Sequence, residues 1–163
     1  MKFPVRYVPL KLTQRDKHRQ VTMLLKSRAM YKTNKYYTRP KVASYNSKMS
    51  THIRNARRIY NIEHVLPTNE LSVKTGCSLS ALNKIVSKGK GAYYSSGSRP
   101  NQTPQSWGLA RLASSVTGGK AAAVDYDIIE QCCDHKKKAF MLATKSRKRY
   151  KYGHSKTKKI HIE

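Results

Sequence analysis

Apolar positions in the first 60 residues recur at helical spacing in two stretches. Thr13, followed three residues later by Asp16, is typical of a helix N-terminus, so we predict a basic amphipathic helix over 14–30. A second helix is predicted over 48–60, with its apolar positions on one face: Met49, Ile53, Ala56 and Tyr60. Asn and Pro residues interrupt the polar stretch between the two, which predicts irregular or extended chain there.

The clearest local pattern predicts a helix, a tight turn and a second helix. The first helix covers 68–74, Gly76 supplies the left-handed turn, and the second helix covers 79–88 and ends at Gly89. The apolar positions follow the spacing of a DNA-binding helix-turn-helix: Leu71, Cys77, Leu82 and Ile85. Two interpretations stay open: a second helix that reads a DNA groove, or a helical hairpin that only packs.

The next segment is rich in Gly, Ser, Pro and Asn, which predicts a series of turns over 89–108. Within it, Thr103 followed by Pro104 predicts the start of a fifth helix, which the pair Gly118 and Gly119 stops. A further helix is predicted over 121–132. Its inward residues are Val124, Ile128 and Ile129, and its outward residues are Asp125, Asp127 and Glu130.

Net charge divides the chain into three segments. Residues 1–62 hold sixteen Lys and Arg against one acid, residues 63–134 hold seven against six, and residues 135–163 hold eleven against one. Charge at that density repels itself in a compact chain, so the basic segments are expected to meet a polyanion. We therefore predict a mainly α protein. A small, near-neutral helical core of two hairpins over 63–134 lies between extended basic arms over 1–62 and 135–163.

The C-terminal tail begins with a basic run that is predicted to prolong the preceding helix through Phe140, Met141 and Leu142. Beyond Thr144 the chain has too little apolar content to fold alone. Three interpretations stay open for this part: a nuclear-import signal, a nucleic-acid-binding arm, or a solvated tail.

Cysteine usage and hydropathy indicate the class of protein. An odd number of cysteines with an adjacent pair, Cys77, Cys132 and Cys133, suits neither a routine disulfide nor a zinc site, which predicts free thiols in a reducing compartment. Prolines and basic residues break the first 12 positions, so no signal peptide is expected, and no stretch approaches the length of a membrane span.

An enzyme is not expected from the motifs. TGGK at 117–120 lacks the full frame of a phosphate loop, and SKGKGAYYSSG at 87–97 resembles a stretch of ADP-ribosyltransferases without an upstream His-Gly partner or a catalytic acid. The six histidines lie scattered among cations, which is typical of solvated side chains. We therefore predict no catalytic residue, no metal site, no cofactor and no small-molecule substrate.

Two stretches resemble a known family: YYTRPKVASYNSKMSTHIRNARRIYNI (36–62) and KTGCSLSALNKIVSKGKGAYYSSGSRPNQTPQSWGLARLASSVTGGKAAAVDYDII (74–129). They are similar to small basic proteins encoded by large nucleocytoplasmic DNA viruses, notably algal chloroviruses and their mimivirus-like relatives. The similarity spans roughly residues 5–133. The resemblance implies a setting and no catalytic residues: a virion structural protein beneath the capsid shell, or a protein that accompanies the viral genome.

The expected function within that setting is that of a minor capsid protein, bound between or beneath major capsid subunits on the internal face of the capsid, after synthesis in the host cytoplasm. Its partners would be the major capsid protein and other minor capsid proteins. Viral DNA and an anionic inner membrane surface are further partners to consider. The alternative is a non-specific, genome-associated nucleic-acid-binding protein, for which the charge and the helix-turn-helix-like segment are the reasons.

Two sets of side chains are candidates for partner contacts. The candidates for ion pairs or phosphate contacts are Arg39, Lys41, Arg54, Arg57, Arg58, Arg99, Arg147, Lys148 and Arg149. The candidate packing anchors are Tyr36, Tyr37, Tyr93, Tyr94 and Trp107. For Trp107, burial in the protein's own core is the favoured interpretation.

Overall fold

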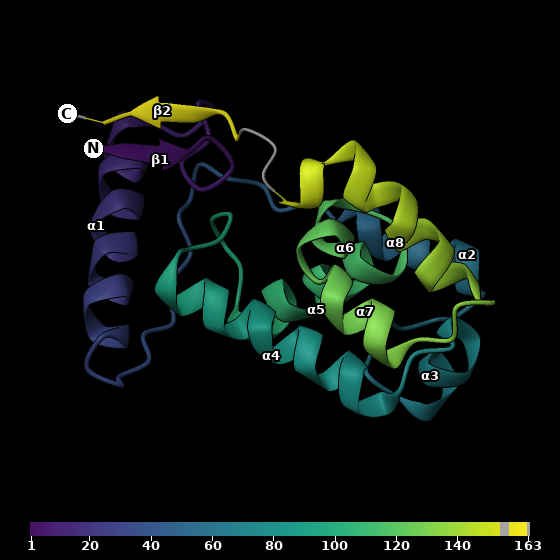
Figure 1. The fold of residues 1–163 in the computed structure, drawn as a ribbon. Helices are drawn as coiled ribbons and strands as arrows, with labels where there is room; N and C mark the ends of the chain where they lie inside the picture. Colours follow the sequence, from purple (N-terminus) through teal and green to yellow (C-terminus); the bar gives the residue numbers. More distant parts are fainter. Residues whose placement is uncertain (154–156, 163) are drawn as a thin grey trace. The chain divides into compact units, whose positions relative to one another are not determined.

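Helices make up most of the structure. A computed structural model describes residues 1–153 and 157–162 (Figure 1). The helices are α1 (Gln14–Tyr31), α2 (Thr51–Tyr60), α3 (Asn69–Thr75), α4 (Leu79–Ser95), α5 (Pro104–Val116), α6 (Lys120–Val124), α7 (Tyr126–Cys132), α8 (Lys138–Arg149) and the short 3-10 helix η1 (Lys151–Gly153). The strands are β1 (Lys2–Pro4) and β2 (Lys159–His161). The predicted mainly α class with a helical core is confirmed.

The chain forms two compact units, each built from separate stretches of sequence. Unit 1 consists of Met1–Lys48, Lys90–Trp107 and residues 157–162. Unit 2 consists of Met49–Gly89 and residues 108–153. Because α4 and α5 each continue from one unit into the other, the units divide the chain at different positions from the three charge segments.

Unit 1 has an apolar core of its own. The strands pair antiparallel, with Phe3 opposite Ile160, and α1 turns its buried face toward the same core. Its buried members are Phe3, Tyr7, Val8, Leu12, Val21, Met23, Leu24 and Val42. Residues 1–48 are therefore folded, which differs from the extended arm expected from their charge. The physical reason is that α1, with help from β1 and β2, buries enough apolar surface to fold this segment despite its charge.

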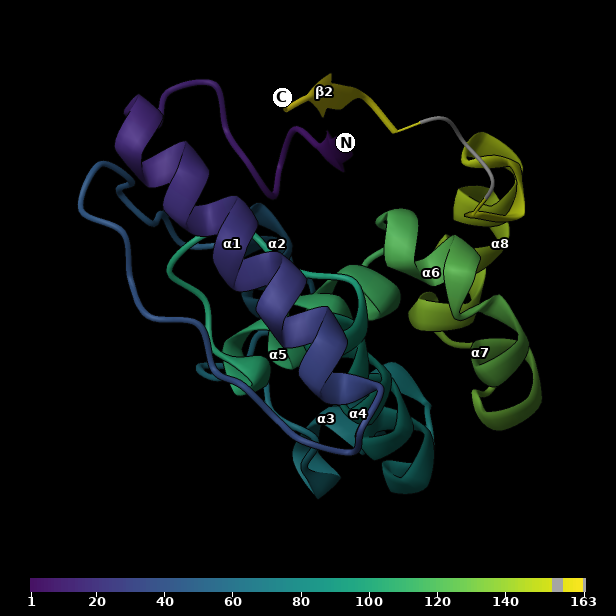
Figure 2. The ribbon, with the colours of Figure 1, turned by 90° about the vertical axis from the view of Figure 1, so that its left-hand side faces the viewer.

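The segment after α1 runs back along that helix (Figure 2). Asp16 near the start of α1 accepts hydrogen bonds from Ser44, while Ser27 near its end contacts Arg39. Helix α1 begins at the predicted cap, because the Thr13 hydroxyl accepts a hydrogen bond from the Asp16 amide at 3.2 Å. The predicted helix over 14–30 is confirmed, and α2 confirms the second one.

The helix-turn-helix-like segment of unit 2 folds as its local pattern predicted at three positions. The Thr68 hydroxyl accepts the Leu71 amide at the start of α3, Gly76 ends α3 with a φ of 78°, and Ser78 caps α4. The four apolar positions that define the pattern are buried, so this hairpin packs into the core of unit 2.

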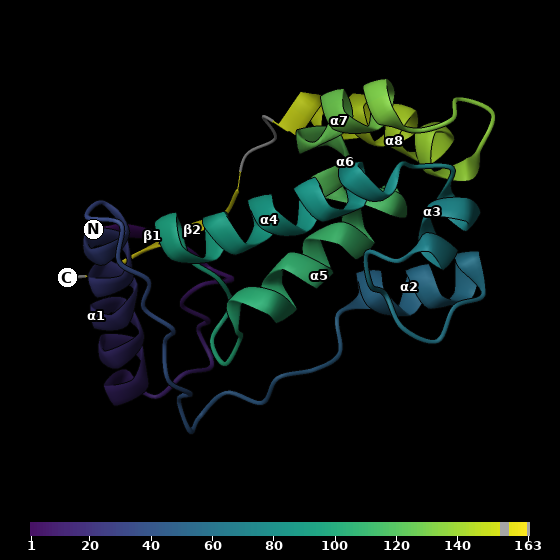
Figure 3. The ribbon, with the colours of Figure 1, turned by 90° about the horizontal axis from the view of Figure 1, so that it is seen from below.

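The predicted stop of α4 at Gly89 is wrong, as are the turns expected over 89–95, because the helix continues to Ser95. Gly89 serves packing: a Cβ built there would lie 2.6 Å from the Gly108 Cα of α5. The two glycines let α4 and α5 approach closely, and Figure 3 shows the two helices side by side. The predicted start of α5 at Thr103 and Pro104 is confirmed.

The helix predicted over 121–132 is broken at Asp125 into α6 and α7. Asp125 was expected to point outward, yet it is 1% exposed and its carboxylate accepts hydrogen bonds from Arg111 and Ser115. Val124 was expected to point inward and is exposed instead. The ion pair with Arg111 holds the Asp125 side chain inside the unit, although the apolar spacing had predicted that it points outward. Ile128 and Ile129 are buried as predicted.

The expectation of free thiols throughout is wrong. Cys77 and Cys133 form a disulfide, and Cys132 is free and exposed. The adjacent cysteines diverge because α7 ends at Cys132, whereas Cys133 is extended and pairs with Cys77 in an antiparallel bridge. Successive side chains of extended chain point to opposite sides, so only one of the pair can face Cys77.

The C-terminal tail packs on unit 2 through the helix α8, which is separate from α7 and runs past Thr144 to Arg149. Its buried face consists of small residues, Ala139, Ala143 and Ser146, and the Ser146 hydroxyl donates to the Gly119 carbonyl at 2.7 Å. The tail does not fold alone, since neighbouring helices cover its one apolar face. Residues 154–156 and 163, which belong to the predicted tail, lie outside the described residues.

Candidate nucleic-acid interface

Unit 1 carries most of the excess positive charge. The described residues of its three stretches contain seventeen Lys and Arg against one acid, a net charge of +16, whereas those of unit 2 contain sixteen against six, a net charge of +10. Asp16 is the one acid among the described residues of unit 1. A surface with this balance attracts anions.

Asp16 offsets only one unit of this charge, and its carboxylate is bonded within the fold. Its Oδ2 accepts hydrogen bonds from the Ser44 amide at 2.8 Å and from the Ser44 hydroxyl at 2.5 Å. These bonds lower the pKa of Asp16, and the nearby Arg19 and Arg15 lower it further. Among the described residues of unit 1, no Lys or Arg forms an ion pair with a carboxylate.

Three tyrosines from separate parts of unit 1 form a cluster, which we call the tyrosine cluster: Tyr31, Tyr36 and Tyr94. The Tyr31 and Tyr94 rings are nearly parallel, 9° apart, with centroids separated by 6.2 Å. The Tyr36 ring lies 5.0 Å from Tyr94 and 6.1 Å from Tyr31. Tyr36 is 66% exposed and Tyr31 is 36% exposed, so much of this aromatic surface faces solvent.

A tight turn brings Tyr36 back onto the end of α1. The Lys35 amide donates to the Met30 carbonyl at 2.9 Å, and the Asn34 amide donates to the Tyr31 carbonyl at 3.0 Å. Asn34 adopts the left-handed conformation, with a φ of 60°, that asparagine tolerates better than most residues. The same turn presents Lys32 and Lys35 to solvent beside the cluster.

Arg39 supports the cluster from inside the unit. Its guanidinium lies over the Tyr93 ring, with Cζ 3.8 Å from the ring centroid, and donates to the Tyr93 carbonyl and the Ser27 and Ser98 hydroxyls. The Ser27 hydroxyl in turn donates to the Tyr94 carbonyl at 3.0 Å. Burial lowers the pKa of Arg39 and raises the pKa of Tyr93. This network joins α1, the end of α4 and the returning segment.

The unusual SGSRPNQ stretch (96–102) has a structural role in unit 1. Asn101 accepts the Val42 amide through its side-chain oxygen, and its side-chain nitrogen donates to the Val42 and Tyr45 carbonyls. Gly97, with a φ of 142°, leaves room for Leu24 and Tyr7. Arg99 lies between these anchored positions and is exposed.

The predicted contact residues fall into different environments. Arg39 is 6% exposed and its side chain is used within unit 1, so it is removed from the candidate surface. The other cations of the set are exposed except Arg147, which is half-buried over the Tyr126 ring at 4.4 Å. The exposed ones are Lys41 and Arg99 in unit 1, and Arg54, Arg57, Arg58, Lys148 and Arg149 in unit 2.

The predicted aromatic anchors divide in a similar way. Tyr93 is fully buried, and Trp107 packs against the unit 1 core with its ring centroid 6.4 Å from that of Tyr7. Tyr37 is half-buried under Lys26, whose Nζ is 4.4 Å from the ring centroid. Tyr36 and Tyr94 belong to the tyrosine cluster.

Sequence reasoning missed three residues of this surface: Tyr31, Lys32 and Lys35. The available signal was Asn34, four residues after the end of the helix predicted over 14–30, since Asn just beyond a helix is typical of a left-handed turn. Asn83 and Lys84 are exposed on α4, as groove reading would need, and that interpretation stays a prediction.

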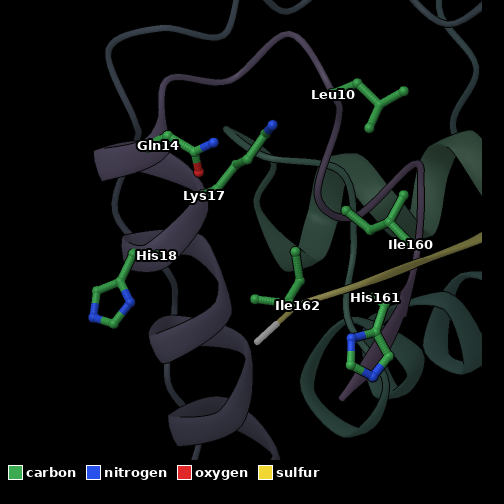
Figure 4. Close-up of a pocket in the computed structure, with 7 residues that line it drawn as sticks. All are labelled: Leu10, Gln14, Lys17, His18, Ile160, His161 and Ile162. Carbon is green, nitrogen blue, oxygen red and sulfur yellow. The ribbon is translucent and has the colours of Figure 1, made fainter.

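A shallow pocket of about 330 Å³ in unit 1 offers no comparable chemistry (Figure 4). It is lined by Leu10, Gln14, Lys17, His18 and residues 160–162. His18 and His161 lie on opposite sides of it, so they do not converge on one point. The described residues contain no group of three or more His, Cys, Asp or Glu side chains that could hold a metal ion. No helix in the described part of the chain is long and apolar enough to cross a membrane.

Comparison with known proteins assigns the chain to a family. No curated protein and no solved structure matches it. A family model matches residues 4–134, which include α1 through α7 and all three residues of the tyrosine cluster. The chain therefore belongs to the family of unknown function DUF5824.

Proposed function

We propose that this protein binds nucleic acid through its phosphate groups, without reading base sequence. The observation that carries the proposal is the unpaired charge of unit 1, whose net charge is +16 and whose described Lys and Arg residues form no ion pair with a carboxylate. Such cations are available to replace the counterions of a phosphate backbone, and counterion release favours binding.

The placement of the exposed cations supports phosphate contacts over base reading. They are distributed among the turn after α1, the loop at Arg99, helix α2 and the end of α8. The outward residues of α4, where a recognition helix would need a bidentate partner for guanine, include Lys84 and Lys88 and no Arg. The resemblance to proteins of large DNA viruses supports a viral genome as the nucleic acid.

The experiment that tests this function measures binding of the full chain to labelled DNA by fluorescence anisotropy over a series of salt concentrations. A protein that contacts 6–10 phosphates should lose about 10³–10⁵ in affinity between ~50 and ~200 mM salt, with little difference between duplex sequences. Absence of binding at the lowest salt concentration would refute the proposal. A large preference for one sequence, abolished by changing Asn83 and Lys84, would replace it with groove reading.

A minor capsid protein is the second candidate, favoured by the surface of unit 2. Arg54, Arg57 and Arg58 are exposed on α2, and the same unit exposes Met49 by 52% and Val73 by 72%. Apolar side chains together with arginines are typical of a protein interface, whereas phosphate binding does not require the apolar ones.

Virus particles emptied of DNA distinguish the two functions. A minor capsid protein should remain on the shell at symmetry-related positions, since each copy would contact identical capsid surfaces. Reversing the three α2 arginines to glutamate should then reduce incorporation into the shell, while leaving the helix content of the isolated protein unchanged. Loss of the protein together with the DNA supports the genome-associated function.

A further inference from the structure

We infer that the tyrosine cluster binds unpaired bases of single-stranded nucleic acid, an inference that rests on the proposed function. Sequence-tolerant binding of single strands combines aromatic side chains, on which bases stack, with cations that follow the backbone. Unit 1 brings both features together at the end of α1.

Tyr36 is 66% exposed although its ring contacts both Tyr31 and Tyr94, so one side is supported and the rest is open to a ligand. A solvated aromatic ring of this size covers little of the protein's own core. Its exposed surface is available for stacking with a planar base.

The turn at Asn34 holds Tyr36 through backbone hydrogen bonds, and the Arg39 network holds the end of α4 that carries Tyr94. The rings are therefore positioned before a ligand arrives. Binding then requires little further loss of side-chain freedom, which favours affinity.

Lys32 and Lys35 are exposed within the turn that separates Tyr31 from Tyr36. The one described acid of unit 1, Asp16, is bonded to Ser44 at the other end of α1. An approaching phosphate therefore meets cations and no competing carboxylate of this unit among the described residues.

A single strand fits this surface better than a duplex. The bases of a duplex are stacked on one another, so a duplex offers its phosphates to the lysines but no free base face to the tyrosines. A single strand offers both its phosphates and its base faces. An acidic protein is the alternative partner for this surface. A surface that binds such a partner has no reason to bind single-stranded DNA more tightly than duplex DNA. The comparison of the two DNAs therefore separates the alternatives.

The test compares Tyr36→Ala and Tyr36→Phe with a matched control, Tyr152→Ala. Tyr152 is 61% exposed in unit 2, so its truncation removes a similar solvated ring outside the cluster. The full chain of each variant is titrated at one salt concentration with a thymidine oligomer of about 15 nucleotides and with a duplex of equal length. Circular dichroism checks that each variant keeps its helix content.

Tyr36→Ala should weaken binding to the single strand by roughly 5- to 150-fold and leave duplex binding unchanged, because one stacking surface is lost and no phosphate contact is. Tyr36→Phe should bind like the parent protein, since stacking uses the ring. Tyr152→Ala should also bind like the parent.

Equal single-strand affinity of Tyr36→Ala and the parent would overturn the inference, and so would an equal loss for single strand and duplex. In both cases the parent still binds DNA, so the proposed function stands. Failure of the parent to bind either DNA would instead refute the proposed function, which keeps the two failures distinguishable.

Discussion

The disulfide between Cys77 and Cys133 ties the turn between α3 and α4 to the end of α7. Backbone hydrogen bonds flank it on both sides, from Ser78 to the Cys132 carbonyl and from Asp134 to the Gly76 carbonyl, each at 2.8–2.9 Å. The covalent bond therefore closes a contact that the backbone also makes.

Removing this disulfide should lower the stability of the protein strongly. The cysteines are separated by 56 residues, and closing a loop of that length removes chain entropy from the unfolded state worth about 4 kcal/mol. Cys133→Ser should therefore lower the denaturant midpoint, measured by circular dichroism, while the neighbouring Cys132→Ser serves as the control and should leave it nearly unchanged. Three reactive thiols in the folded, unreduced protein would contradict the expected pairing.

Replacing Asp125 should lower the free energy of unfolding more than replacing any other described acid of unit 2. Asp125 receives hydrogen bonds from Arg111 at 2.7 and 3.0 Å and from Ser115 at 2.9 Å, and Lys88 lies 3.8 Å away. Asp125→Ala leaves the half-buried Arg111 without its partner, so we expect a loss of about 3 kcal/mol in the free energy of unfolding.

The control for this change is Asp127→Ala, because Asp127 is exposed two residues away. Its effect should stay within about 0.5 kcal/mol. Equal losses for the two variants in chemical denaturation would show that the Arg111 pair does not stabilise unit 2.

Two glycines of α4 should respond to alanine in opposite directions. A methyl group at Gly89 would lie 2.6 Å from the Gly108 Cα, so Gly89→Ala should destabilise the protein by about 1–3 kcal/mol. At Gly91 the nearest atom is the Tyr31 hydroxyl oxygen at 3.8 Å, so Gly91→Ala should stabilise by about 0.4–1 kcal/mol through loss of unfolded-state freedom. Thermal unfolding of the pair checks the sign, and a stabilised Gly89→Ala would refute the close helix contact.

Stability should depend on pH through Asp16. The Ser44 hydrogen bonds lower its pKa below the ordinary value of 3.8, so the folded state favours the carboxylate. The stabilisation is present above the unfolded pKa and is lost as pH falls through the lower, folded pKa. The difference in urea midpoint between the parent and Asp16→Asn should therefore shrink as the solution is acidified below that range. A difference that stays constant down to full protonation would argue against the Ser44 bonds as the cause.

Local signals in the sequence predicted much of the secondary structure. The caps at Thr13, Thr68, Ser78 and Thr103 all lie at helix starts, because a cap depends on residues within three positions of one another. Signals of this kind do not depend on the tertiary fold, so they can be read directly.

The failures all involve contacts between distant residues. Gly89 resembles a helix stop until Gly108 is beside it, and Asp125 resembles an outward acid until Arg111 is known to face it. The same holds for the candidate site. Tyr36 and Tyr94 were identified as aromatic candidates, but their meeting with Tyr31 depends on a chain reversal and on the end of α4, which lie far apart in sequence.

The pairing of β1 with β2 has a consequence for how the protein is made. Residues near Phe3 leave the ribosome long before Ile160, which packs against the unit 1 core beside them and follows more than 150 positions later. Until then the nascent chain carries an apolar surface that lacks its cover, next to a high density of positive charge. All described residues of unit 2 lie at or before position 153, so they are synthesised before β2. Unit 1 is therefore the unit that stays incomplete longer during synthesis, with part of its apolar core uncovered.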